Sequence, residues 1–263
     1  MRVDHPVQRH SGADLWNVLL GVAVIVLTAT STYGWTEIRA LNDRLERLEH
    51  SDGGRDGSQV AEVAPAAGSI DDQFTSLRAT VTTRDAAFRG DPAASVVLLE
   101  FSDFECPFCA RHFSSTYKRV IEQYVATRKI KYVFRHLPLE EIHAKAFLAA
   151  EVAECSRRQG VFWDVHDQFF SRQRTLQEGD LRRIAVSAGA DAGRLDECVD
   201  ASARDQVLRD VTDARNLGAA GTPLFLAGRA ISNEMMQASY SISGARSFDV
   251  FQLVLDRLLA SRK

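Results

Sequence analysis

The sequence predicts an α/β domain that occupies most of the chain, and three observations indicate it. The apolar run at residues 96–101 is typical of a strand buried on both faces of a sheet. A helical periodicity and a second predicted strand at 130–134 follow, which together predict a β-α-β unit with a right-handed crossover. Residues 144–218 are then largely helical by pattern.

The N-terminal part of the chain is different in kind. Residues 1–14 are polar and are expected to form a cytoplasmic tail, whereas residues 15–36 carry no charge. About 22 uncharged residues are long enough to cross the hydrocarbon core of a bilayer, and Trp16 and Trp35 lie near the ends of this run. We expect an uncleaved transmembrane anchor; a cleaved signal peptide and a buried soluble helix are the alternatives.

The charges that flank the anchor do not settle its orientation. Arg2 and Arg9 precede the apolar run, and Arg39, Arg44 and Arg47 follow it closely. The positive-inside rule therefore gives no support to a cytoplasmic N-terminus. We place the following domain outside the cytosol on chemical grounds: it carries a C-x-x-C pair, Cys106 and Cys109, and a membrane-tethered dithiol is most useful in an oxidising compartment.

Two segments connect the anchor to the domain. Residues 37–50 have apolar positions three and four apart and predict an amphipathic helix of two heptads. Residues 51–79 are expected to be a flexible linker, rich in glycine over its first part, with one or two helical turns at 71–78. The folded domain is then expected to span residues 80–263.

The residues with reactive side chains lie directly after the first buried strand. Cys106 and Cys109 enclose Pro107 and Phe108 at the start of a predicted helix, and proline suits the first helical position. Cys106 then caps the helix, where unpaired N–H groups and the helix dipole favour a thiolate and lower the pKa of the thiol. A strand, a turn and a C-x-x-C helix start predict a redox dithiol.

Zinc binding and two inert buried cysteines are the alternatives to a redox dithiol. Zinc usually takes four ligands, and the sequence has no second C-x-x-C and no H-x-x-x-H. His112, three residues after Cys109, lies where a helix surface would place it. Inert cysteines would leave Pro107 and the preceding strand as coincidences, so the redox interpretation is preferred.

The remaining elements are expected in chain order. They are an edge strand at 79–83, a loop through 90–92, a strand at 224–227, a turn at 228–229 and a closing amphipathic helix at 248–259. Residues 230–244 are longer and more polar than a simple hairpin requires, and we assign them no function.

Two motifs carry a resemblance to a known family. The segment at 100–109, Glu-Phe-Ser-Asp-Phe-Glu-Cys-Pro-Phe-Cys, resembles the active site of the DsbA-like thiol-disulfide oxidoreductases of the thioredoxin superfamily. Residues 221–229 resemble the cis-proline loop of that superfamily and the strand after it. The resemblance covers about residues 80–263 and implies a thioredoxin fold with a helical subdomain inserted at about 142–218.

The resemblance also implies roles for single residues. Cys106 is the nucleophile, Cys109 is the resolving or leaving thiol, and Glu100 is a buried acid that relays the proton of Cys109. Burial should raise the pKa of Glu100, unless it is a strand-end residue that faces solvent. Pro223 is expected in the cis form, which turns the backbone of Thr222 towards the dithiol and its substrate.

Pro107 and Phe108 are expected to contact the substrate, and Phe108 departs from the family pattern. DsbA has a histidine at the second position between its cysteines, which helps to hold the thiolate. Phe108 carries no hydrogen-bond donor or charge, so the reduced form should be less stabilised. A less stabilised reduced form makes a milder oxidant.

Cys155 and Cys198 lie on apolar faces of the helical block. Because relatives often link these helices, the resemblance implies a structural disulfide between the two residues. Two free buried thiols are the alternative. An even number of cysteines, four, is also compatible with an oxidising compartment.

Composition narrows the function classes. The net charge of −3, without a basic stripe, gives no indication of nucleic-acid binding. Four histidines fall inside the domain, and we expect no metal there; they are His112, His136, His143 and His166. No cofactor is expected either, because the dithiol carries the electrons itself.

The function expected from these observations is oxidation of dithiols in exported proteins by an enzyme of the cell envelope. The family implies a membrane redox partner of the DsbB or VKOR type that would reoxidise the dithiol. A reductase or isomerase of the same fold is the first alternative. A membrane-tethered binding module without catalysis is the second.

Overall fold

A computed structural model describes residues 69–261, which lie in one compact unit, Ala66–Lys263. The predicted tail, anchor and amphipathic helix, and most of the predicted linker, lie outside these residues. Among the residues described, none of the helices has both the length and the apolar character needed to cross a bilayer.

The centre of the unit is a six-stranded mixed sheet in the order β1-β6-β5-β3-β4-β2. β3 and β4 are parallel, and every other neighbouring pair is antiparallel. The strands are β1 (Thr75–Thr82), β2 (Ala87–Gly90), β3 (Val96–Ser102), β4 (Ile130–His136), β5 (Leu224–Ser232) and β6 (Met235–Ser243).

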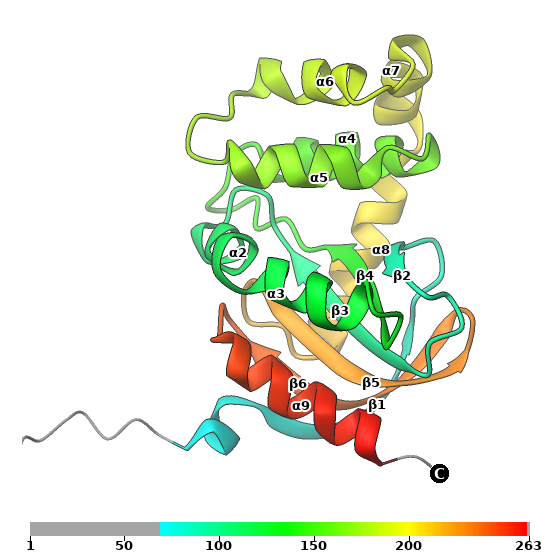
Figure 1. The fold of residues 1–263 in the computed structure, drawn as a ribbon. Coiled ribbons are helices and arrows are strands. Elements are labelled where there is room, and N and C mark those ends of the chain that lie inside the picture. Colours follow the sequence, from blue (N-terminus) through cyan, green and yellow to red (C-terminus); the bar gives the residue numbers. More distant parts are fainter. Residues whose placement is uncertain (1–68, 262–263) are drawn as a thin grey trace, which may run out of the picture. The chain divides into compact units, whose positions relative to one another are not determined.

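Helical segments complete the fold around this sheet. The cysteine-bearing segment alternates α-helical and π-helical turns: α2 (Pro107–His112), η2 (Phe113–Tyr117), α3 (Lys118–Val120) and η3 (Ile121–Val125). The others are η1 (Ile70–Gln73), α4 (Ala146–Arg158), α5 (Phe162–Ser171), α6 (Glu178–Ser187), α7 (Ala192–Ala201), α8 (Ala203–Asn216) and α9 (Phe248–Ala260). In Figure 1, α4 to α7 lie together at one end of the unit, beyond the sheet, and α9 runs along the sheet.

Alternation along β3 assigns its two faces to different helices. Val96 and Leu98 pack into a core with residues of α3 and α9, whereas Val97 and Leu99 pack against α8. All seven residues of β3 are buried, as its apolar sequence predicts for a central strand. Glu100 therefore faces the same side as α2.

A buried ion pair connects the helical subdomain to the sheet. Arg135 on β4 is 2% exposed, and its guanidinium donates to Asp210 of α8 from Nε at 2.9 Å and from Nη2 at 2.7 Å. The same Nη2 donates to Asp213 at 2.7 Å. Removing one partner would leave the other charge buried and unpaired, so this contact fixes α8 against the sheet.

The β-α-β unit, the helical insertion and the closing helix agree with the sequence, but three boundaries do not. The linker was expected to reach residue 79, whereas β1 already begins at Thr75 and pairs with β6 as an edge strand. The expected helical turns at 71–78 are limited to η1. The short edge strand β2 was not predicted; it pairs antiparallel with β4.

The turn expected at 228–229 is wrong, because β5 continues through Gly228 and Arg229 to Ser232. The chain reverses at Asn233 and Glu234, and the polar residues at 230–244 supply the end of β5 and the whole of β6. Gly228 marks a register shift in the pairing with β6, where an added Cβ would lie 2.0 Å from the Gln237 carbonyl oxygen. Glycine is required here by the close approach of two strands and not by a turn.

Candidate active site

The dithiol lies at the junction of β3 and α2. Cys106 is the N-cap residue of α2 with extended backbone angles, and Pro107 occupies the start of the helix, as predicted. Both thiols are free and buried: Cys106 is 3% and Cys109 is 1% exposed. Exposure therefore does not distinguish the two thiols.

The two sulfurs differ instead in acidity. The neighbouring Cys109 thiol, the largest influence, lowers the pKa of Cys106 to about 6, and this outweighs the effect of burial. The Thr222 hydroxyl and the backbone N–H groups of Cys109 and Phe108 lower it further. Burial raises the pKa of Cys109 well above its usual value, and the charges of Cys106 and Glu100 act in the same direction. At neutral pH, Cys106 is the thiolate and Cys109 keeps its proton.

The loop before β5 comes close to the reactive sulfur. The Thr222–Pro223 peptide bond is cis, and Sγ of Cys106 donates to the carbonyl oxygen of Thr222 at 3.5 Å. The Thr222 hydroxyl is buried and has no hydrogen-bond partner among the described residues. When Cys106 ionises, this hydroxyl is available to donate to the thiolate.

Glu100 lies on β3 beneath the dithiol. Its side chain is 2% exposed, so the alternative of a solvent-facing strand end is wrong. Burial raises the pKa of Glu100 to about 7, and the hydroxyl of Tyr132 on β4, which donates to its carboxylate, partly opposes that rise. A carboxyl group with this pKa exchanges protons near neutral pH.

Tyr132 is the site residue that the sequence reasoning missed. Tyr132 stands opposite Leu98 in the parallel pair of β3 and β4, one step along the same face from Glu100. A hydroxyl-bearing side chain within an apolar strand next to a buried acid was the available signal. The register of the two strands, which brings the groups together, cannot be obtained from either strand alone.

The two residues between the cysteines face outwards. Pro107 is exposed, and Phe108 is 52% exposed with the Arg111 guanidinium 5.0 Å from its ring centroid. An exposed aromatic ring beside a reactive thiol is available to a protein substrate. Its predicted role in substrate contact stays a prediction.

The second cysteine pair lies in the helical subdomain. Cys155 of α4 and Cys198 of α7 form a disulfide with an S–S distance of 2.07 Å. Their surroundings are the apolar side chains of the helical core, including Val152 and Leu195. This disulfide joins helices outside the dithiol site.

The four histidines serve local contacts. Nδ1 of His143 is 2.7 Å from Asp103, and Nδ1 of His166 is 2.7 Å from Asp167. His112 is buried against Phe225, and burial lowers its pKa to about 3. Within residues 69–261, no three metal-ligating side chains gather into a site.

Comparison with known proteins agrees with this geometry. The family described as Thioredoxin matches residues 82–241. The structure resembles alpha-DsbA1 of Wolbachia pipientis, with a TM-score of 0.58, 22% identity and coverage of 67% of this chain and 92% of that one. It also resembles oxidised BdbD of Bacillus subtilis, with a TM-score of 0.59, 20% identity and coverage of 71% and 99%. The fold is therefore the DsbA-like thioredoxin fold with an inserted helical region.

A curated relative of another kind matches about half of this chain. The chain is 37% identical over 138 residues to the Na(+)/H(+) antiporter NhaA 3 of Salinispora tropica. The match covers 52% of this chain but spans only 21% of the antiporter.

Proposed function

The chain belongs to the thioredoxin family, and on that premise we propose that it is a thiol-disulfide oxidoreductase that oxidises dithiols of exported proteins. The observation that carries the proposal is the opposite direction of the two cysteine pKa shifts. Cys106, with the low pKa, is the sulfur that attacks a client disulfide or is attacked by a client thiolate. Cys109, with the high pKa, is the sulfur that carries a proton.

The oxidation begins with the Cys106–Cys109 disulfide. A client thiolate attacks Sγ of Cys106, the bond between Cys106 and Cys109 breaks, and Cys109 leaves with the electron pair. The client is then joined to Cys106 in a mixed disulfide. A second client thiolate attacks the client sulfur of that bond and releases Cys106 as a thiolate. The client gains one disulfide, and the enzyme pair takes up two electrons.

Glu100 and Thr222 assist different steps of this reaction: Glu100 the departure of Cys109, and Thr222 the release of Cys106. Because the pKa of Glu100 is about 7, its protonated form can supply the proton that the departing Cys109 requires. The released Cys106 thiolate is stabilised at the helix start and by the free Thr222 hydroxyl. The backbone of Thr222 before cis-Pro223 offers hydrogen bonds to an extended client segment.

The cellular setting belongs to the same proposal. A disulfide catalyst of this kind requires an oxidising compartment, and residues 15–36 would anchor it to the membrane with the catalytic domain on the extracytoplasmic side. A quinone-linked membrane protein of the DsbB or VKOR type would remove the two electrons. No cofactor enters the exchange itself.

The test is direct trapping. The oxidised full-length chain is mixed with a reduced test protein, and the free thiols of the test protein are counted over time, separately from those of the enzyme. The wild type should remove two thiols for each disulfide of enzyme consumed. Reduced Cys109→Ala, mixed instead with the disulfide form of the test protein, should accumulate a mixed disulfide visible on a non-reducing gel, because Cys106 attacks the client disulfide and no resolving thiol remains in the enzyme. Absence of both results would contradict the proposal.

A reductase or isomerase is the second candidate, because Phe108 offers no hydrogen bond or charge to the thiolate. The resting state of the dithiol separates the two candidates. Trapping intact cells with a membrane-impermeant alkylating reagent should find Cys106 and Cys109 mostly oxidised for the proposed oxidase. A mostly reduced pair would favour the second candidate. A pair that the reagent still fails to label after the cells are treated with a thiol reductant would contradict the extracytoplasmic location.

A further inference from the structure

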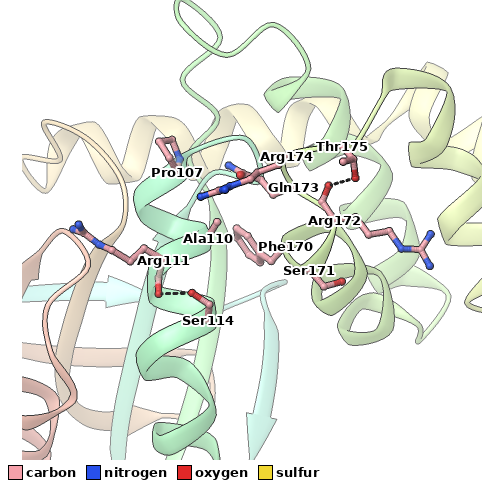
Figure 2. A pocket seen from close by; sticks show the side chains of 10 residues that line it. All are labelled: Pro107, Ala110, Arg111, Ser114, Phe170, Ser171, Arg172, Gln173, Arg174 and Thr175. Atoms are coloured by element: carbon pink, nitrogen blue, oxygen red, sulfur yellow. Dashed lines mark hydrogen bonds between the residues drawn. The ribbon is translucent and has the colours of Figure 1, made fainter.

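A groove beside the dithiol is not used by the mechanism above. It has a volume of about 470 Å³ and lies between α2 and the segment that follows α5 (Figure 2). Pro107, the residue next to Cys106, lines one side, and residues 171–175 line the other. The apolar side chains of Ala110 and Phe170 lie between the two sides. A client chain joined to Cys106 would lie next to this groove.

The charged residues of the groove are all cations. Arg111, Arg172 and Arg174 line it, and neither aspartate nor glutamate does. Within residues 69–261, none of the observed ion pairs involves any of these three exposed arginines. These arginines leave a local positive potential beside the reactive sulfur.

Glu105, the acid next to the dithiol in the sequence, is paired with another cation. Glu105, the residue before Cys106, has its carboxylate 3.1 Å from Nζ of Lys145. Gln173 donates from Nε2 to the backbone oxygen of Glu105 at 2.5 Å, which ties the groove wall to the loop that carries the dithiol. The position of the arginine-bearing segment relative to Cys106 is therefore fixed by a direct contact.

The three arginines differ in direction. Figure 2 shows the side chain of Arg174 extending across the groove towards α2, while those of Arg111 and Arg172 point outwards on opposite sides. Arg174 is thus placed to meet a ligand in the groove. The other two contribute to the field around it and to the capture of a chain that continues past its ends.

We propose that this groove binds an acidic segment of the reduced client, with Arg174 as its principal charged contact. The proposal rests on the proposed function and names the class of client that the site prefers. The client would pair its backbone with Thr222 on one side of Cys106 and pass over Pro107 into the groove on the other. There a carboxylate would meet a guanidinium, the group best suited to bind it, and an adjacent apolar side chain would rest on Ala110 and Phe170.

The test uses three dithiol peptides that differ only in the residues flanking their cysteines: glutamates, serines or lysines. The oxidised full-length chain, held in an uncharged detergent, should oxidise the glutamate peptide about threefold to tenfold faster than the serine peptide at low salt. The lysine peptide should be the slowest. The differences in oxidation rate among the three peptides should shrink at about 1 M salt, where the screening length falls to about 3 Å.

Reversing the charge of Arg174 tests whether the preference for the glutamate peptide arises in the groove. Arg174→Glu should reverse the order of the glutamate and lysine peptides while leaving the serine peptide within about twofold of the wild-type rate. Arg209→Glu is the matched control, because Arg209 is also exposed but lies on α8 and does not line the groove. It makes the same change in net charge and should keep the wild-type order.

Two results would overturn the proposal. The first is an unchanged glutamate preference in Arg174→Glu, and the second is an equal slowing of all three peptides, which would indicate an effect on Cys106 and not on client choice. Failure of the proposed function looks different, because then no peptide is oxidised. In that case fluorescence anisotropy with cysteine-to-serine versions of the peptides decides, since equal binding of acidic and basic peptides would contradict the groove proposal.

Discussion

Cysteine has two different roles in this domain, one in each of its two cysteine pairs. Cys106 and Cys109 are three residues apart at the start of a helix, whereas Cys155 and Cys198 are 43 residues apart and join α4 to α7. Burial alone does not separate the pairs, because Cys106, Cys109 and Cys155 are all at most 3% exposed, while Cys198 is partly exposed. Their neighbours do.

Polar and ionisable groups surround the reactive pair. A helix start, the Thr222 hydroxyl and Glu100 all act on its two sulfurs and shift their pKa values. In the other pair, Cys155 is buried in the apolar helical core, and Cys198 is partly exposed and packs against that core. The contrast indicates that polar groups that stabilise a thiolate, and not burial alone, make a cysteine reactive. The predictions below test this contrast, starting with the largest effect.

Loss of the reactive sulfur should abolish exchange and leave the fold intact. Cys106→Ser removes the only atom that can form the mixed disulfide, so oxidation of a reduced test protein should fall by about a thousandfold or more, to the uncatalysed rate. The hydroxyl is close to the thiol in size, so the thermal midpoint should change little. A variant that still oxidises the test protein would show that another sulfur is the nucleophile.

Loss of the second pair should lower the stability of the fold and leave the rate of client oxidation nearly unchanged. Replacing Cys155 and Cys198 together by alanine should lower the free energy of unfolding by about 2–4 kcal/mol, because the unfolded chain gains the freedom of a long loop. Urea denaturation of the variant and of the wild type measures this difference. The rate of client oxidation, measured well below the unfolding midpoint, should stay within about twofold. A large loss of rate in a folded variant would mean that the helical disulfide shapes the dithiol site.

Glu100→Gln should slow client oxidation by roughly tenfold to a hundredfold at pH 6, the range expected for loss of a general acid. In the wild type, the assisted rate should fall as pH rises through about 7, where Glu100 loses its proton. The variant cannot donate, so its rate should lack this step. Stopped-flow measurement of mixed-disulfide formation between pH 5 and 9 gives both profiles. Parallel profiles for the two proteins would remove Glu100 from the proton transfer.

The same substitution tests the raised pKa through stability. Glu100 has a higher pKa folded than unfolded, so its contribution is complete below the unfolded value of about 4.3 and is lost as pH rises through about 7. The free energy of unfolding of the reduced wild type should therefore fall, relative to Glu100→Gln, between about pH 4 and pH 7. Chemical denaturation at a series of pH values measures the difference. A constant difference across this range would mean that the pKa of Glu100 is ordinary in the folded protein.

Local patterns predicted much of this site, and contacts between elements account for what they did not predict. Proline after Cys106 indicated a helix start, and the family resemblance implied that Glu100 is a buried acid, both of which the structure contains. The course of β5 through Gly228 depends instead on how closely β6 approaches, and that distance has no local signal. The groove with Arg174 likewise combines two segments about 65 residues apart in the sequence.

Tyr132 carries the smallest expected effect, and it tests whether the polar surroundings of the dithiol are tuned in detail. Its hydroxyl stabilises the Glu100 carboxylate, so Tyr132→Phe should raise the pKa of Glu100 by up to about one unit. The pH at which the assisted rate falls should move upwards by the same amount, with little change in the rate at pH 5. Tyr117→Phe is the matched control, because the Tyr117 hydroxyl accepts from Arg89 at 2.7 Å and makes no hydrogen bond to Glu100 among the described residues. Equal shifts in the two variants would point to general loosening of the aromatic core, whereas a shift confined to Tyr132→Phe would show that one hydroxyl on β4 sets the proton affinity beneath the reactive pair.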